Sequence, residues 1–345
     1  MPRLMRSTIC KFSFALVVFF SNATHAQFQN LDQDVSNFVN DAVFYADKFI
    51  GPSLDGVIYQ SSPLWMTTPK KQGFGTVTLA LHGNVFFVPK SNRTFTLNQS
   101  DFSFFNLPNG QTSLEVPTGL GGDTDFSYTG QFGGLPISIS APEGVNQERV
   151  TYPYLQSGVE LWGGLEVMGR FSPKVELKKG SYQMYGFGLK YNLSQHMNFL
   201  ERNNIALAAL LATSNEDLTF DFIESDVDQL GDVGISEIKG DVSNWQFQIS
   251  GAKTWGNFEI MLSTITVLSD TNYYLQGEES DFSQLIPLAE ILNAEIAKKD
   301  GRRFNSIHEV SGRYSFGDFS VQSGVLLGDF FNVNIGVQYQ INIKK

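Results

Sequence analysis

Long stretches in which apolar and polar residues alternate with a period of two are the feature that most constrains this fold. Successive side chains of a β-strand point to opposite faces, so this period predicts strands. The clearest example is residues 330–343, in which every second residue from Phe331 to Ile343 is apolar. The same alternation predicts strands at 74–88, 157–171, 182–193, 203–213, 243–255, 257–269, 305–316 and 319–327, and about three less regular ones within 93–140.

The length of these strands and of their connections predicts a membrane barrel. The strands are about 9 to 15 residues long, whereas soluble strands are commonly about 5 to 6 and bilayer-spanning ones about 9 to 11. A soluble sandwich would also alternate. If the C-terminus is periplasmic, however, the two longest connections, 214–242 and 270–304, both fall outside the cell, as in transmembrane barrels. We therefore predict an all-β, transmembrane antiparallel β-barrel of 10–14 strands, with 12 as the best estimate.

Composition excludes several other classes of protein. The 35 acidic residues outnumber the 24 basic ones, which excludes a basic nucleic-acid-binding surface. A single cysteine excludes a disulfide-based scaffold. Residues after the N-terminal segment contain no apolar run of about 20, which excludes a helical membrane protein.

The N-terminal region divides into a targeting segment and a helical segment. Basic residues precede the apolar run 12–20 and the small, polar residues 21–26 follow it, a pattern that predicts a signal peptide over 1–26. Apolar residues then recur at helical spacing from Val35 to Phe49. We expect 27–72 to be a helical, plug-like segment at or inside the periplasmic mouth, and 73–345 to be a barrel in the outer membrane of a Gram-negative cell.

Strand parity assigns a set of ionisable side chains to the barrel lumen. These candidate lumen or ligand-binding residues are His82, Glu160, Glu166, Arg170, Lys190, Glu309 and Arg313. One interpretation is an ion-pair network that fills a narrow barrel; the other is a polar constriction or solute site. A charged side chain that faces lipid destabilises the barrel by about a few kcal/mol. Under both interpretations we therefore expect these side chains to point into the lumen.

Catalytic and cofactor signals are weak. No Gly-x-Ser-x-Gly motif accompanies the few histidines, so no enzyme is predicted and no cofactor is expected. One acidic stretch has the spacing of a calcium loop, although the sequence favours a solvated acidic loop there. The candidate metal ligands are Asp226, Asp228, Asp232 and Glu237. A helix is predicted near 284–298, inside the second long connection.

Several segments together resemble a known family. The C-terminal strand carries Asn334, Gly336, Tyr339 and Ile341 at the spacing of a signal for the outer-membrane assembly machinery. The segments 74–89, 153–158, 164–173 and 186–191 resemble a family of uncharacterised outer-membrane barrels of Bacteroidota, a domain of unknown function. This resemblance implies a barrel and no activity. The layout of helix, small-residue stretch and barrel is also similar to that of long-chain fatty-acid transporters, without their Asn-Pro-Ala motif.

These observations predict a passive channel or transporter for small molecules, hydrophobic ones among them. The alternative is a non-transporting structural or interaction barrel that presents long extracellular loops to a partner. The expected partners are outer-membrane lipid, the assembly machinery and a small hydrophobic solute, with no nucleic acid.

Overall fold

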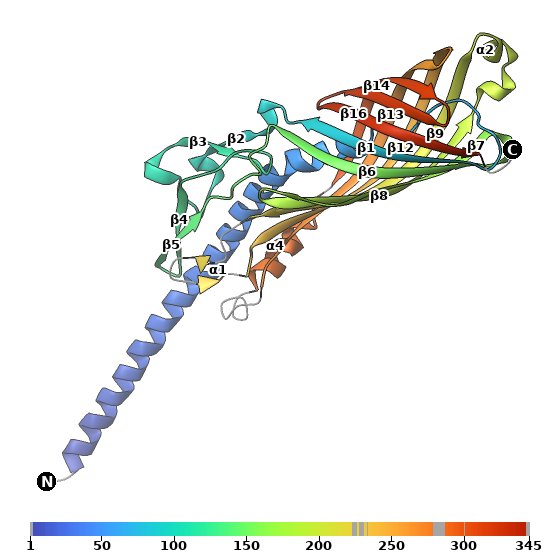
Figure 1. The fold of residues 1–345 in the computed structure, drawn as a ribbon. Coiled ribbons are helices and arrows are strands. Elements are labelled where there is room, and N and C mark those ends of the chain that lie inside the picture. The colour runs from blue at the N-terminus through green and yellow to red at the C-terminus, as the bar shows by residue number, and fades with distance from the viewer. Residues whose placement is uncertain are drawn as a thin grey trace.

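The protein folds as a closed antiparallel β-barrel around an N-terminal helix (Figure 1). The structure, a computed structural model, describes residues 3–222, 226–227, 231–232, 234–278, 287–299 and 301–342. In these residues, ten strands form the barrel in the order β1-β16-β15-β14-β13-β12-β9-β8-β7-β6. Their bounds are β1 Thr76–Phe87, β6 Arg149–Glu160, β7 Leu165–Leu177, β8 Gly180–Asn192, β9 Ile205–Asp221, β12 Glu237–Trp255, β13 Phe258–Gln276, β14 Arg302–Phe316, β15 Phe319–Leu327 and β16 Phe331–Asn342.

The barrel class is confirmed, and ten lies within the predicted 10–14, but the best estimate of 12 is wrong. The predicted strand 157–171 is two strands, β6 and β7, because Gly163 and Gly164 adopt positive φ angles of 69° and 75° and reverse the chain. The strands expected within 93–140 form two small sheets outside the barrel. These are β2 (Thr94–Asn98) with β3 (Ser113–Pro117), and β4 (Ser127–Phe132) with β5 (Leu135–Ser140). At 5 to 6 residues each, they are too short to cross a bilayer.

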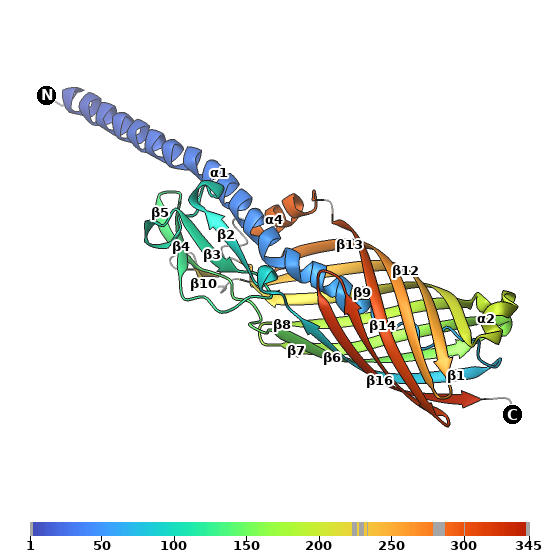
Figure 2. The same ribbon diagram turned by 90° about the horizontal axis from the view of Figure 1, so that it is seen from above.

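The two ends of the barrel differ in their connections. One end, here called the turn end, carries the turns at 161–164, 256–257 and 317–318, the short helix α2 (Asn198–Arg202) and the last residue of β16. The opposite end, the cap end, carries residues 88–148 with β2–β5, called the cap, and the connections that contain α4 (Leu288–Ile296) and the hairpin of β10 (Asp226–Val227) and β11 (Gly231–Asp232). Figures 1 and 2 show β2–β5 and α2 at opposite ends. The helix predicted near 284–298 corresponds to α4, and residues 284–286 lie outside the described residues.

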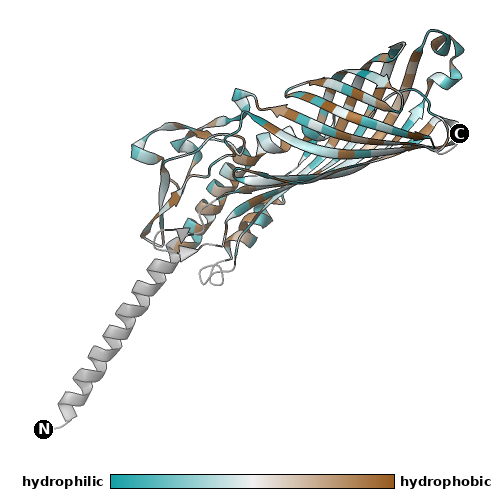
Figure 3. Cartoon of the chain, viewed as in Figure 1, coloured by the Kyte–Doolittle hydropathy of each residue, from teal (hydrophilic) through white to brown (hydrophobic). Residues whose placement is uncertain are grey.

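The outer surface of the barrel is an apolar belt. Figure 3 shows hydropathy alternating along each strand, and the large side chains that point outward are well exposed. They include Leu79, Leu81, Leu155, Phe187, Trp245, Phe247, Leu262, Leu268, Ile335 and Val337. So large a continuous apolar surface is the kind that lipid covers. Among the described residues, no helix combines the length and the apolarity that crossing a membrane requires.

The inner surface has two zones. Toward the cap end it is apolar, as at Ile238 and Val242 of β12, and toward the turn end of the same strand it becomes polar, at Gln246, Gln248 and Ser250. β13 changes similarly, from Val267 and Ile265 to Ser263 and Glu259, whereas β9 stays apolar toward the turn end, at Ala208 and Leu210. The lumen therefore offers a hydrophobic socket at one end and a hydrogen-bonding wall at the other.

The C-terminal part of the helix α1 (Arg3–Ser61) occupies the apolar zone, and the preceding part packs against the cap (Figure 2). Phe49 packs against Phe220 of β9 with ring centroids 6.1 Å apart, and Phe38 packs against Phe104 and Phe105 of the cap at 5.3 and 5.5 Å. After Ser61 the chain runs irregularly through the polar zone to β1. The structure thus places the helix at the cap end, and its predicted position at the periplasmic mouth stays a prediction. Among the described residues, the apolar side chains of α1 pack against the cap and the cap-end half of the lumen.

We expect Gly336→Ala to weaken the seam at which the barrel closes. Gly336 of β16 pairs with His82 of β1, and a Cβ at Gly336 would lie 2.3 Å from His82 Nδ1. The buried His82 ring cannot retreat, because it stacks on Tyr154 at 4.7 Å. Overpacking of this kind costs about 1–3 kcal/mol.

The measurement is the unfolding temperature of protein refolded in detergent, where the assembly machinery plays no part. Gly83→Ala is the matched control, since its Cβ would meet only Ile335 Cγ2 at 4.0 Å. Equal unfolding temperatures for the two variants would contradict this account of the seam.

Candidate functional site

Residues 59–70, here called the plug segment, fill the polar zone of the lumen. Side chains of the barrel wall donate hydrogen bonds to ten of its backbone carbonyls. The pairs are Asn332 with Tyr59 O, Tyr152 with Gln60 O, Arg170 with Ser61 O and Pro63 O, Gln246 with Ser62 O, Gln156 with Trp65 O, Gln322 with Met66 O, Lys190 with Thr68 O and Lys70 O, and Asn192 with Pro69 O. Buried carbonyls in the last turn of a helix, such as those of residues 59–61, and in the irregular chain after it need such partners. The barrel wall supplies the hydrogen-bond donors that the backbone of a helix or sheet would otherwise supply.

Arg170 of β7 is the central contact. Its guanidinium donates to Ser61 O at 2.9 Å, to Pro63 O at 2.8 Å and to Gln156 Oε1 at 2.7 Å. The same group lies over the rings of Trp65 and Tyr154, at 4.1 and 4.4 Å from their centroids. The side chain is 3% exposed. Arg170 therefore holds the plug segment both by charged hydrogen bonds and by stacking.

Glu309 of β14 holds the point at which the chain changes direction after α1. Its Oε2 accepts a hydrogen bond from the Leu64 backbone nitrogen at 2.7 Å. Leu64 has a φ of 50°, which is uncommon for a residue with a side chain. The carboxylate thus stabilises an unfavourable backbone conformation at a residue that is fully buried.

Lys190 of β8 organises an ion cluster near the turn end. Its Nζ pairs with Glu166 and lies 3.8 Å from Glu160 Oε2, and all three side chains are at most 5% exposed. Beside the cluster, Lys70 of the plug segment pairs with Glu259 at 3.4 Å. Charges of both signs therefore close the lumen where the plug segment leaves it.

All seven predicted lumen residues face the lumen, but they play different parts there. Arg170, Lys190 and Glu309 contact the plug segment directly, whereas Glu160 and Glu166 act through Lys190. The other two contact the barrel wall: His82 stacks on Tyr154, and Arg313 Nε donates to Gln338 Oε1 at 2.9 Å. A role for these residues in binding a solute stays a prediction.

Several uncharged residues that hold the plug segment were not among the predicted site residues: Tyr152, Tyr154 and Gln156 were missed altogether, and Asn192 and Asn332 were placed only on the polar faces of predicted strands. The first three lie on β6, which was not recognised as a strand. Their inward alternation continues from Val150 to Glu160 and was available as a signal.

The predicted calcium site falls partly on residues outside the described part of the chain. Asp228 lies outside the described residues. Asp226 and Asp232 face each other in the backbone register of β10 and β11, and Glu237 begins β12. Among the described residues, no group of three or more His, Cys, Asp or Glu side chains is placed to hold a metal ion. Calcium binding stays a prediction.

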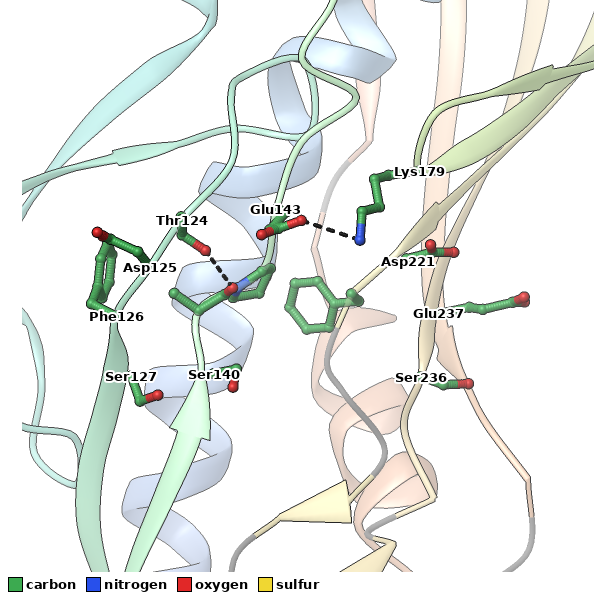
Figure 4. A pocket seen from close by; sticks show the side chains of 13 residues that line it. Thr124, Asp125, Phe126, Ser127, Ser140, Glu143, Lys179, Asp221, Ser236 and Glu237 are labelled. Carbon is green, nitrogen blue, oxygen red and sulfur yellow. Dashed lines mark hydrogen bonds and ion pairs between the residues drawn. The ribbon is translucent and has the colours of Figure 1, made fainter.

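A cleft of about 720 Å³ opens at the cap end (Figure 4). It lies between the β4–β5 sheet and the ends of β8, β9 and β12, and its acidic side chains include Asp125, Asp221 and Glu237. Lys179 crosses it to meet Glu143 at 3.1 Å, and this hydrogen bond and the charge of Glu143 raise the pKa of Lys179 above its usual value. The cleft is thus a negatively charged surface beside the mouth of the barrel.

Comparison with solved structures finds bacterial membrane barrels. The translocator domain of autotransporter NalP from Neisseria meningitidis is 7% identical with a TM-score of 0.32, over 88% of this chain and 98% of that one. The COG4313 outer membrane channel from Pseudomonas putida F1 is 9% identical with a TM-score of 0.36, over 81% and 100%. The outer membrane protein OprG from Pseudomonas aeruginosa is 10% identical with a TM-score of 0.29, over 78% and 97%. Nothing about activity follows from superpositions this loose.

Comparison with curated proteins finds no match. The sequence profile of a family of unknown function does match, and it extends over residues 5–341, nearly the whole chain. The resemblance to an uncharacterised family is thereby confirmed: the chain belongs to the family of unknown function DUF6588.

Proposed function

We propose that this protein is an outer-membrane channel that passes small molecules when its plug segment moves aside, and that it is closed in the conformation described here. One observation carries the proposal: the lumen is filled by a separable segment of chain that hydrogen bonds hold to a polar wall. Barrels of about 8 strands are filled by their own inward side chains, and those of 16 or more leave an aqueous channel. A ten-stranded barrel with a removable plug falls between these cases.

The apolar belt supports a location in the outer membrane, with residues 1–26 directing export. Outer-membrane lipid and the assembly machinery are the partners that such a location implies.

The lining of the polar zone supports a small polar or charged solute. Once the plug segment leaves, the hydrogen-bond donors and carboxylates of the barrel wall would face water. Water can replace the backbone carbonyls of the plug segment as hydrogen-bond partner at a small cost in free energy. The hydrophobic solute that the overall layout suggested would have to pass this polar wall. It would find apolar surface mainly in the zone that α1 now fills, besides a smaller cluster that includes Met168, Ala208 and Leu210.

A second candidate is a non-transporting barrel that presents its cap to a partner. The observation that favours it is the completeness of the plug contacts, which leave the polar zone of the lumen densely bonded. The acidic cleft at the cap end would then belong to the presented surface.

Removing residues 27–70 should convert a closed barrel into an open one. In planar bilayers we expect rare, brief openings from the full chain and steady conductance from the deletion variant, because the deletion empties the polar zone. Swelling of liposomes in small sugars, amino acids or apolar solutes then identifies the solute class.

Resistance of the barrel to unfolding in detergent at room temperature verifies that the deletion variant folds. If it does not fold, the Arg170 variant described in the Discussion opens the lumen with a single substitution. Absence of conductance and of solute passage in every folded form would refute the channel and favour the interaction barrel.

A further inference from the structure

The plug segment crosses the lumen in one direction. Tyr59 is bound by Asn332, at the cap end of β16, and Pro69 is bound by Asn192, at the turn end of β8. The residues between them are bound by side chains at intermediate levels of the wall. The chain therefore enters the lumen at the cap end, leaves it at the turn end and continues into β1.

Built contacts hold the middle of α1, around Phe38 and Asp41, at the cap end. The buried Asp41 carboxylate accepts hydrogen bonds from three consecutive backbone nitrogens of the cap, those of Ser103, Phe104 and Phe105, at 3.0, 2.7 and 3.0 Å. Three N–H groups on one carboxylate are a specific site for that charge. With the aromatic packing of Phe38, they join α1 to the cap rather than to the turn end.

The apolar zone is also shaped to fit α1. An added Cβ at Gly240 of β12 would lie 2.7 Å from Leu54 Cδ2, and one at Gly56 of α1 would lie 2.9 Å from Phe86 of β1. Helix and wall approach each other at these points only because glycine is present. A helix inserted from the turn end would instead place these apolar residues against the glutamines and charges of the polar zone.

The cap end also has the features of the outer face of a membrane barrel. The longest connections lie there, whereas short turns and both ends of the barrel sequence lie at the turn end. Bacterial barrels place short turns in the periplasm and long connections outside.

From these observations we propose that the chain crosses the outer membrane once more, through its own lumen, so that α1 between residue 27 and Asp41 lies on the cell surface. The resident ligand of the lumen is then an extended polypeptide. The wall recognises it mainly through backbone carbonyls, which every residue has, rather than through particular side chains. This proposal rests on the proposed outer-membrane location, and it goes beyond channel function because it holds whether or not a solute passes.

Cysteine labelling tests this topology sharply, because the chain has a single cysteine, Cys10, within the predicted signal peptide. Three single variants place a thiol at exposed positions: Ser36→Cys on α1, Thr112→Cys on the cap and Asn257→Cys at the turn end. The probe is a large polyethylene-glycol maleimide, which cannot cross an intact outer membrane. The chain without an introduced cysteine is the negative control. Labelling after denaturation verifies that each introduced thiol can react with the probe.

We expect intact cells to label Ser36→Cys and Thr112→Cys, and permeabilised cells to label Asn257→Cys in addition. Labelling of Thr112→Cys but not Ser36→Cys on intact cells would place α1 inside the cell envelope and overturn the proposal. Labelling of Asn257→Cys on intact cells would reverse the barrel and overturn it equally. If the channel proposal is wrong but the topology is right, the protein shows no conductance and the labelling pattern is still the expected one.

Discussion

Replacing Arg170 by glutamine should raise the open probability of the channel in planar bilayers at least tenfold. Glutamine keeps a polar side chain but cannot reach both Ser61 O and Pro63 O, and it gives up the stacking on Trp65. Hydrogen bonds from a charged donor contribute about 1.5–3 kcal/mol each. Losing one of them changes an equilibrium by tenfold or more, since about 1.4 kcal/mol corresponds to a factor of ten.

Arg313→Gln is the matched control for the Arg170 variant. Arg313 is also buried in the lumen, at 7% exposed, but its hydrogen bond is to Gln338 of the barrel wall rather than to the plug segment. Both variants remove one positive charge from the lumen. If they raise the open probability equally, lumen charge rather than release of the plug segment controls opening, and the plug mechanism fails.

Replacing Lys190 by methionine should destabilise the folded barrel by about 3–5 kcal/mol, the cost of removing one partner from a buried ion pair. Methionine fills a similar volume but leaves Glu160 and Glu166 without their cation, at side-chain exposures of 1% and 5%. It also removes the donor to Thr68 O and Lys70 O. The measurement is equilibrium unfolding by urea in lipid vesicles at neutral pH.

Two further variants separate the electrostatic part of this loss from other effects. Adding Glu160→Gln and Glu166→Gln to the Lys190→Met variant removes the unpaired charges, and we expect it to recover most of the lost stability. Lys174→Met breaks the exposed pair with Glu176, which should cost less than about 1 kcal/mol. A Lys190→Met variant no less stable than Lys174→Met would show that the buried cluster is not needed for folding.

Much of the barrel could be predicted because the alternation of side chains between the two faces of a strand depends only on neighbouring residues. Alternation in 319–327 and 330–343 reflects one face toward lipid and one toward the lumen, and β15 and β16 match these ranges within a residue or two. The error at 157–171 has a local cause too. Leu161 continues the apolar alternation into the turn, and the chain reversal depends on the backbone of Gly163 and Gly164 rather than on hydropathy.

The assembly signal illustrates how one stretch of sequence can have two explanations. Asn334 and Gly336 were singled out for recognition by the assembly machinery. In the folded barrel, Asn334 donates to Asn84 Oδ1 at 2.8 Å and Gly336 leaves room for His82. Both residues are therefore also required by the closing seam between β1 and β16.

By itself the sequence determined that this chain forms long antiparallel strands with a lipid-facing side and a polar inner side, because each residue carries that information in its own polarity and position. Only the tertiary structure decided that residues 59–70 fill the lumen and from which end α1 enters. Those outcomes depend on pairs such as Tyr59 with Asn332, which lie 273 residues apart. The wall binds the plug segment by its backbone carbonyls, which are the same in every residue. The side chains of the plug segment therefore do not predict where in the barrel it binds.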